Sequence, residues 1–382
     1  MIRSTTRRPL GRAPVLLAGA FGQGNPGDEA LLDAFRRALD DLPLVIASTD
    51  PAETEQRHGL PAISSRSWRD VTRVVSNSAG VVFAGGTVFK NLVADTGRAR
   101  TALLRNALAV AAFGRAVGVP VCMTGVGVGD ISGFASRALA RQLARHADLL
   151  VLRDAPSARA LARVGVPAPL RVGADPAWTL LDQVPADRDE DSDVVVVVPS
   201  VWAAATSPRL IDVLVDSLQR LIDVGCTIHV QPWQSDVRGV DDRRFAEAIA
   251  GGLVGDVTVV PPPESLEDAA HAFTSARLVI SARFHALVAA GAAGTPFIAL
   301  AHEHKQRAIA DRLGQPTLWA QATPAHAHAV MQDALSVAPP AHAAVRAEIA
   351  AAEEAFGLLR LVLSGGEMSA ESISGLHLEP AW

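Results

Sequence analysis

The chain of 382 residues contains no tyrosine, only two cysteines, and aromatic residues amounting to 4% of the whole. Two cysteines cannot build a disulfide framework, and they lack the spacing of a metal site. Cys122 and Cys226 stand in apolar, strand-like runs, which are typical of buried thiols. A reducing, cytoplasmic compartment is therefore expected.

Strong charge of one sign and long apolar runs are also missing. The net charge is −5, and the only scatter of basic residues lies within the first dozen positions, so no nucleic-acid partner is expected. No apolar run reaches the ~18 residues of a transmembrane helix. The apolar stretch Pro14–Phe21 resembles a short signal sequence, but it leads directly into a glycine loop and a helix. This context favours a first β-strand.

Short apolar runs alternate with helical patterns along the chain, which indicates βαβ units with parallel sheets. The fold class predicted is α/β, with two doubly wound Rossmann-like domains facing a cleft. We expect domains at residues 1–185 and 194–335, joined by the acidic linker Leu181–Asp193, and a C-terminal helix and tail at 336–382. The expected strands are Val15–Ala20, Leu44–Ser48, Val81–Ala84, Val119–Thr124, Leu149–Leu152, Leu170–Val172, Val194–Val198, Thr227–Val230, Val257–Val260, Leu278–Ile280 and Phe297–Ala301. The expected helices are Asp28–Leu39, Gly97–Val117, Phe134–Arg145, Ala155–Val164, Pro208–Val224 and Ala343–Leu363.

The first glycine-rich loop, Gly22–Ala30, follows a strand and matches the spacing of a dinucleotide-binding fingerprint. Two features argue against that ligand. Pro26 removes a backbone N–H, and Asp28 and Glu29 place negative charge where a pyrophosphate would lie. A simple turn with an acidic helix cap remains an alternative.

Two further glycine loops, Gly85–Thr87 and Gly125–Asp130, follow other strands of the first domain. Because ligands bind outside the carboxyl ends of parallel strands, these loops could let the backbone approach a ligand closely. Arg153 directly follows the strand Leu149–Leu152 and opens toward the same edge, or else forms a surface ion pair with Asp154.

The strongest local signal is the sequence around Arg283 and His285, which interrupts an apolar stretch. An extended backbone would place both side chains on one side. An arginine can clamp a carboxylate or phosphate, and a neighbouring histidine can exchange protons near neutral pH. Lys305 could add another positive charge. His302 and His304 flank Glu303 without a further ligand, so no metal site is expected.

Two tryptophans follow strands of the second domain and could stack on a sugar face. These are Trp202 and Trp233. Packing in the core is the commoner role of tryptophan and stays open as the alternative.

Together these segments resemble the polysaccharide pyruvyl transferase family. The matching pieces are Gly24–Ala30, Gly85-Gly86, Gly125–Asp130, Arg153-Asp154 with Ser157, Asp175 with Ala177, and Ser281–Ala286. Two positions depart from the family pattern. Thr87 stands where relatives often have a third glycine, and Pro199–Trp202 lacks an arginine that relatives often carry.

The resemblance implies a glycosyltransferase B architecture and transfer of pyruvyl from phosphoenolpyruvate, with no cofactor, to a saccharide or lipid-linked saccharide. It makes Arg153 and Arg283 donor ligands and His285 the general acid. Lys305 is expected to assist donor binding. The loop residues expected to contact substrate are Gly24, Asn25, Gly27, Asp28, Gly85, Gly86 and Gly127.

Two other functions remain open: a nucleotide-sugar glycosyltransferase of the same architecture, and a non-catalytic saccharide-binding relative. The apolar helix at Ala343–Leu363 could support peripheral association with the inner face of the membrane, although it lacks a strongly basic face. Packing of this helix on the domains is the simpler interpretation.

Overall fold

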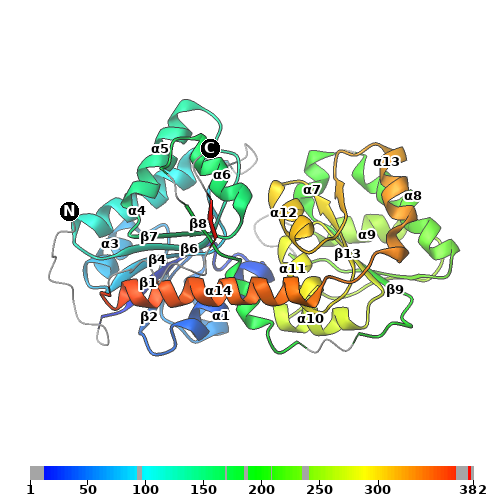
Figure 1. Ribbon diagram of the computed structural model, residues 1–382, viewed down its shortest axis with the longest axis horizontal. Helices are drawn as coiled ribbons and strands as arrows, with labels where there is room; N and C mark the ends of the chain where they lie inside the picture. The colour runs from blue at the N-terminus through cyan, green and yellow to red at the C-terminus, as the bar shows by residue number, and fades with distance from the viewer. Residues whose placement is uncertain are drawn as a thin grey trace. The chain divides into compact units, whose positions relative to one another are not determined.

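A computed structural model describes residues 13–92, 97–167, 170–184, 188–207, 209–234, 241–366 and the backbone of 377–379. The arginines within the first 12 residues, positions 185–187 of the expected linker and Pro208 lie outside these residues. The chain divides into two compact units (Figure 1). Unit 1 comprises Met1–Gln23, Leu31–Thr179 and Ala350–Trp382, and unit 2 comprises Gly24–Ala30 and Leu180–Ile349.

Besides a boundary at Leu180, before the expected end of the first domain at 185, this division differs from the sequence-based one in two places. The short motif Gly24–Ala30 groups with unit 2, although the strand before it and the rest of its helix belong to unit 1. The chain after Ala350 returns to unit 1 instead of forming a separate tail. Both differences arise from contacts between segments far apart in the sequence, which a reading along the chain does not reveal.

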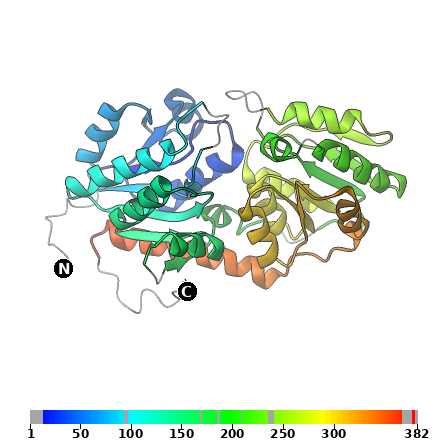
Figure 2. The same ribbon diagram turned by 90° about the horizontal axis from the view of Figure 1, so that it is seen from above.

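Unit 1 is built on a parallel sheet with helices on both faces (Figure 2). Its strands are β1 (Val15–Ala18), β2 (Leu44–Ser48), β3 (Ala62–Ser64), β4 (Gly80–Ala84), β5 (Thr87–Phe89), β6 (Val121–Val128), β7 (Leu149–Leu152), β8 (Leu170–Val172) and β15 (His377–Glu379). Its helices are α1 (Pro26–Ala38), whose first turn belongs to unit 2, α2 (Pro51–His58), α3 (Trp68–Ser76), α4 (Ala102–Ala116), α5 (Phe134–His146) and α6 (Ala155–Arg163), followed by the 3₁₀ helix η2 (Pro176–Leu180).

The strand order in unit 1 is β15-β8-β7-β6-β4-β1-β2-β3, and β15 alone in this order pairs antiparallel. The direction of winding reverses between β1 and β4, so the loops after these two strands lie at the topological switch point. The central strands are apolar on both faces because helices cover both sides. Leu16 and Val81, for example, are fully buried in the core.

Helix α14 (His342–Leu363) supplies part of this cover. Phe356 packs edge-on against Phe35 of α1, with ring centroids 4.9 Å apart. Leu363 lies so close to Gly80 that a side chain on β4 at this position would collide with it. The expected helix Ala343–Leu363 is therefore confirmed.

Unit 2 contains a second parallel sheet. Its strands are β9 (Val194–Val198), β10 (Thr227–Val230), β11 (Val257–Val259), β12 (Leu278–Ser281), β13 (Phe297–Ala301) and β14 (Thr317–Trp319). Its helices are α7 (Val201–Thr206), α8 (Leu210–Asp223), α9 (Arg243–Gly251), α10 (Leu266–Thr274), α11 (Phe284–Ala292), α12 (His304–Arg312) and α13 (Pro324–Gln332), followed by the 3₁₀ helix η3 (Ala334–Ser336).

The strand order β11-β10-β9-β12-β13-β14 is that of a Rossmann fold, with the switch point between β9 and β12. β9 consists of valine alone, as suits a strand covered on both faces. Val195 and Val197 pack in one core cluster with α8, α9 and α13. The alternating Val196 and Val198 point to the opposite face of the sheet. The expected α/β class with two Rossmann-like sheets is confirmed.

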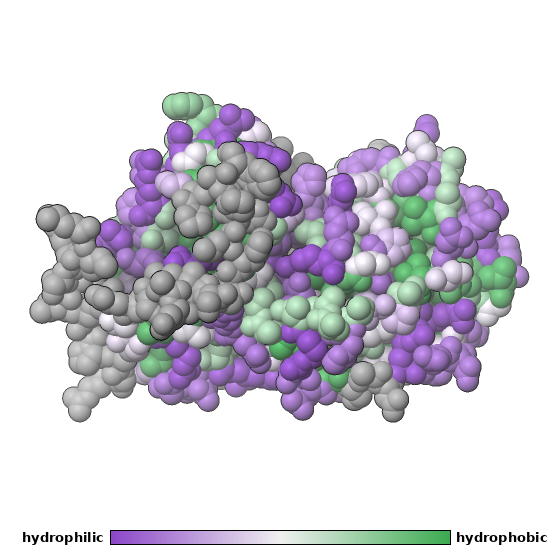
Figure 3. All heavy atoms as spheres, viewed as in Figure 1, coloured by the Kyte–Doolittle hydropathy of each residue, from purple (hydrophilic) through white to green (hydrophobic). Residues whose placement is uncertain are grey.

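The described residues include no helix that is both long and apolar enough to span a membrane. Figure 3 shows a surface on which hydrophilic residues dominate and hydrophobic ones form small patches.

Candidate functional site

Residues predicted to be functional gather where the strands of unit 2 end. Arg283 and His285 follow β12, and Lys305 follows β13. Ser200 follows the neighbouring strand β9 and caps α7 through its hydroxyl. All these strands run in parallel, so their carboxyl ends share one edge of the sheet, and β9 and β12 flank its switch point. In α/β sheets, this is the usual place for a ligand.

Arg283 lies between β12 and α11, in an extended backbone conformation. The hydroxyl of Ser281 fixes this turn by accepting from the Arg283 N–H at 2.9 Å and donating to the Arg283 carbonyl at 3.0 Å. Arg283 is only 9% exposed. Its Nε and Nη2 donate to one oxygen of Asp242 at 2.9 and 2.5 Å, and Nη1 donates to Oε1 of Gln234 at 3.3 Å.

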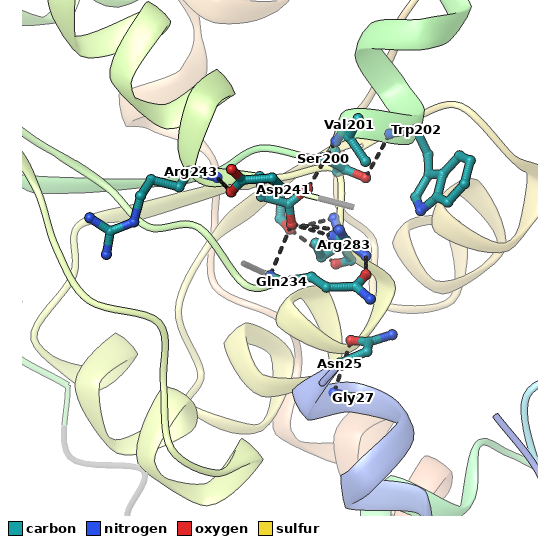
Figure 4. A network of polar contacts seen from close by, with 12 residues as sticks. Asn25, Gly27, Ser200, Val201, Trp202, Gln234, Asp241, Arg243 and Arg283 are labelled. Atoms are coloured by element: carbon teal, nitrogen blue, oxygen red, sulfur yellow. Dashed lines mark hydrogen bonds and ion pairs between the residues drawn. The ribbon is translucent and has the colours of Figure 1, made fainter. Parts of the chain in front are cut away.

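Asp242 is fully buried and is a residue that the sequence analysis missed. Besides Arg283, its carboxylate accepts from the backbone N–H of Val201 at 2.9 Å and from that of Gln234 at 3.1 Å (Figure 4). It thus joins chain segments that follow β9, β10 and β12. No motif surrounds Asp242 in the sequence. The one signal was indirect, because a buried arginine requires a carboxylate partner.

His285 is the second residue of α11. The expectation that an extended backbone places Arg283 and His285 on one side is therefore wrong, because the helix begins at Phe284. The His285 ring is 8% exposed and meets the Phe284 ring edge-on, with centroids 5.2 Å apart. It also lies against Gly27, where an added Cβ would be 2.0 Å from Nδ1. Gly27 is thus required for space.

Asp28 shares the electrostatic environment of His285 and Lys305. Burial raises the pKa of the Asp28 carboxyl above its ordinary value, opposed by the positive charge of His285, a hydrogen bond from Asn25 and the charge of Lys305. The Asn25 amide donates to Asp28 at 2.6 Å, and its oxygen accepts from the Gly27 N–H at 3.2 Å. The motif is therefore more than an acidic cap, because it brings a carboxylate to His285.

Lys305 lies in the first turn of α12 and forms an ion pair with Glu303 at 2.7 Å. His302 contacts the side chain of Gln306 at 3.0 Å. Within the part of the chain that the structure describes, no three His, Cys, Asp or Glu side chains are grouped as a metal site would require.

In unit 1, Arg153 is buried instead of forming a surface ion pair. Its guanidinium donates to Asp154 at 3.2 Å and to the Thr87 hydroxyl at 3.2 Å, and it lies 3.6 Å from Asp175. A Cβ on Gly127 would be 2.5 Å from Nη2. Gly127 therefore makes room for Arg153, whose role as a donor ligand stays a prediction.

Most of the expected glycine loop Gly125–Asp130 is β-strand, so the prediction of a loop there was wrong. β6 continues to Val128 because β5 pairs with it, matching Thr87 with Gly127. The tight turn before β5 contains Gly85 and Gly86, which both adopt positive φ angles of 65° and 68°. Thr87, the departure from the family pattern, starts β5 and contacts Arg153.

The two tryptophans differ in exposure. Trp233 is 2% exposed and its indole N–H donates to Gln231 at 3.4 Å, which argues against stacking on a sugar. Trp202 is partly exposed on α7, and Figure 4 shows its indole directed away from the Arg283 guanidinium.

Comparisons with known proteins bear on this site. A family model described as polysaccharide pyruvyl transferase matches residues 25–304. This range includes Asn25, Asp242, Arg283 and His285. A search of curated proteins finds no match.

Several solved structures share the fold. The S. aureus MnaA–UDP structure is similar with a TM-score of 0.63 and 10% identity, covering 92% of this chain and 97% of that one. Acinetobacter baumannii MurG gives 0.54 and 14%, covering 91% and 99%. Anabaena Alr3699/HepE in complex with UDP-glucose gives 0.54 and 12%, covering 92% and 97%. At these identities the likeness shows the fold, of glycosyltransferase B type, and nothing more.

The contact between Gly27 and His285 predicts a stability effect. Gly27→Ala should lower the free energy of unfolding by about 1–3 kcal/mol, because the added methyl forces the ring or the helix to shift. Thermal unfolding measures it, and Gly357→Ala is the control, since a Cβ at Gly357 would meet nothing within 4 Å. Equal melting temperatures for Gly27→Ala and the wild type would contradict the packing described.

The raised pKa of Asp28 predicts a pH dependence. A carboxyl with a raised pKa contributes most stability below its ordinary value of 3.8, and this contribution is lost as the pH rises through the folded-state pKa. Asp28→Asn should therefore raise the melting temperature at about pH 7, with a smaller gain at about pH 4.

Asp130→Asn is the matched control, for which we expect the opposite change of melting temperature at neutral pH. Burial raises the pKa of Asp130, but hydrogen bonds from Ser132 and Asn91 outweigh burial and lower it overall. This variant should melt at a lower temperature than the wild type at neutral pH. A loss of stability at neutral pH in Asp28→Asn would contradict the burial of that charge.

Proposed function

Because this chain belongs to the polysaccharide pyruvyl transferase family, we propose that it transfers the pyruvyl group of phosphoenolpyruvate to a saccharide. The products are a pyruvate ketal of the sugar and free phosphate. The observation that carries this proposal is that Arg283, His285 and Lys305 follow two neighbouring strands of unit 2, with Asp28 in the electrostatic environment of His285 and Lys305. It combines anion-binding and proton-transferring side chains, which this reaction needs.

Phosphoenolpyruvate presents a carboxylate and a phosphate. An arginine has five N–H donors, and the described contacts of Arg283 use three of them. The remaining donors are those we assign to the donor substrate. The Lys305 ammonium, with a side chain 26% exposed, supplies a second positive charge on the adjacent strand end.

The reaction requires a proton on the methylene carbon of the enol before the neighbouring carbon accepts a nucleophile. We assign this proton to the imidazolium of His285, whose ring lies against Gly27 of the motif that carries Asp28. A sugar hydroxyl then attacks the cationic carbon. The bond from this carbon to the phosphate oxygen breaks, and a second hydroxyl closes the ketal.

The two hydroxyl protons balance the reaction. One replaces the proton that His285 gave to the methyl group, and the other leaves with phosphate or through a base. Asp28 is suited to receive a hydroxyl proton because burial raises the pKa of its carboxyl.

Nucleotide-sugar transfer is the second candidate. It is favoured by the fold shared with a protein solved with UDP-glucose. This activity would not require the arrangement of His285 with Asp28, so we rank it below pyruvyl transfer.

The test is phosphate release from phosphoenolpyruvate in the presence of a panel of methyl glycosides, with UDP-glucose as the rival donor. His285→Ala should lower turnover by about 10² to 10⁴-fold, the usual contribution of general acid catalysis. His271→Ala, on an exposed histidine of the same unit, is the control and should keep its activity. Turnover by His285→Ala near the wild-type rate, or transfer from UDP-glucose alone, would refute the proposal.

A further inference from the structure

Asp242 forms the centre of a hydrogen-bond network that the proposed reaction does not by itself explain. Its two oxygens accept four hydrogen bonds: two from the Arg283 guanidinium, one from the backbone of Val201 and one from the backbone of Gln234. Its own N–H donates to the Gln234 carbonyl at 2.7 Å. The carboxylate is thus fixed independently of Arg283.

We propose that Asp242 is the positioning residue for Arg283, and that with Gln234 it sets the angle at which Arg283 meets the donor anion. The proposal rests on the proposed function, because it assigns phosphoenolpyruvate as that anion. Nε and Nη2 point to Asp242 and Nη1 points to Gln234, so the plane of the guanidinium is held on two edges. A guanidinium recognises carboxylate or phosphate through its planar fork, and this geometry requires a fixed orientation.

Charge explains why a carboxylate holds this arginine. A buried guanidinium without a counter-charge is costly, and Asp242, at 0% exposure, compensates it before the donor arrives. The pair is close to neutral as a whole. Arg283 then contributes mainly direction to donor binding.

A purely structural role would have a different signature. Asp242 also joins the segments after β9 and β10, so its loss could simply destabilise unit 2. That would lower the melting temperature and the fraction of active enzyme, without altering the KM of the enzyme that remains folded. Loss of positioning would raise the KM for phosphoenolpyruvate more than it lowers kcat, because a donor contact present throughout the reaction contributes uniform binding.

The experiment measures kcat, KM for phosphoenolpyruvate and the melting temperature in Asp242→Asn, Gln234→Ala and Arg283→Lys. Asp242→Asn should raise KM by about ten- to a hundredfold, the range for one charge-assisted hydrogen bond. Gln234→Ala removes one neutral acceptor from Arg283 and should raise KM about two- to tenfold. It keeps the backbone contacts of Gln234, so it tests the proposal even if Asp242→Asn fails to fold.

The control is Asp241→Asn. This neighbouring aspartate accepts from the Arg243 N–H at 3.0 Å and pairs with Arg244, away from Arg283 (Figure 4). The KM of Asp241→Asn for phosphoenolpyruvate should equal that of the wild type. In the double variant Asp242→Asn/Arg283→Lys, KM should be no higher than in Arg283→Lys alone, because Asp242 acts through the guanidinium.

The outcomes separate the two proposals. If the wild type releases no phosphate from phosphoenolpyruvate and does not bind it, the proposed function fails. If the wild type is active but Asp242→Asn and Gln234→Ala keep the wild-type KM, the positioning role alone is refuted. The positioning role would also be refuted if the fold-increase of KM in the double variant equalled the product of the increases in the two single variants, since Asp242 would then act independently of Arg283.

Discussion

The buried ion pair between Arg283 and Asp242 is the interaction on which the arrangement of unit 2 depends. Three chain segments, which follow β9, β10 and β12, donate hydrogen bonds to the carboxylate of Asp242. A charge buried without its partner is destabilising, so the loss of either residue should lower the stability of unit 2. The pair therefore fixes the strand-end loops at the switch point and at the same time prepares an arginine for an anion. Structure and proposed function rest on the same hydrogen bonds.

The motif at Gly24–Ala30 adds a second constraint. Gly27 has no side chain where the His285 ring lies, and the charge of His285 acts on the pKa of the next residue, Asp28. Burial disfavours the charge of this carboxylate and raises its pKa, so ionisation of Asp28 has a cost. Groups whose pKa is shifted by burial and by a neighbouring charge are common at catalytic sites. We regard this cost as support for the proton-transfer role assigned to Asp28 and His285.

Much of the fold follows from local sequence, whereas the contacts of the site do not. The valine run Val194–Val198 predicts a strand because an apolar run is visible in the local sequence, without knowledge of the segments that pack against it. Gly127 was assigned to a loop, and only the pairing of β5 shows that it belongs to a strand. Asp242 left no local signal, since its role arises from Arg283, 41 residues later. Likewise, the sequence left sugar stacking and core packing open for Trp233, and its burial in the structure favours core packing.

Calorimetric titration with phosphoenolpyruvate, run beside UDP-glucose, shows whether Arg283 binds the donor. We expect the wild type to bind phosphoenolpyruvate and Arg283→Ala to bind it about tenfold or more weakly. Arg307→Ala, on an exposed arginine of α12 that pairs with Asp311, should bind like the wild type. Unchanged affinity in Arg283→Ala, or a response to UDP-glucose with none to phosphoenolpyruvate, would contradict this expectation.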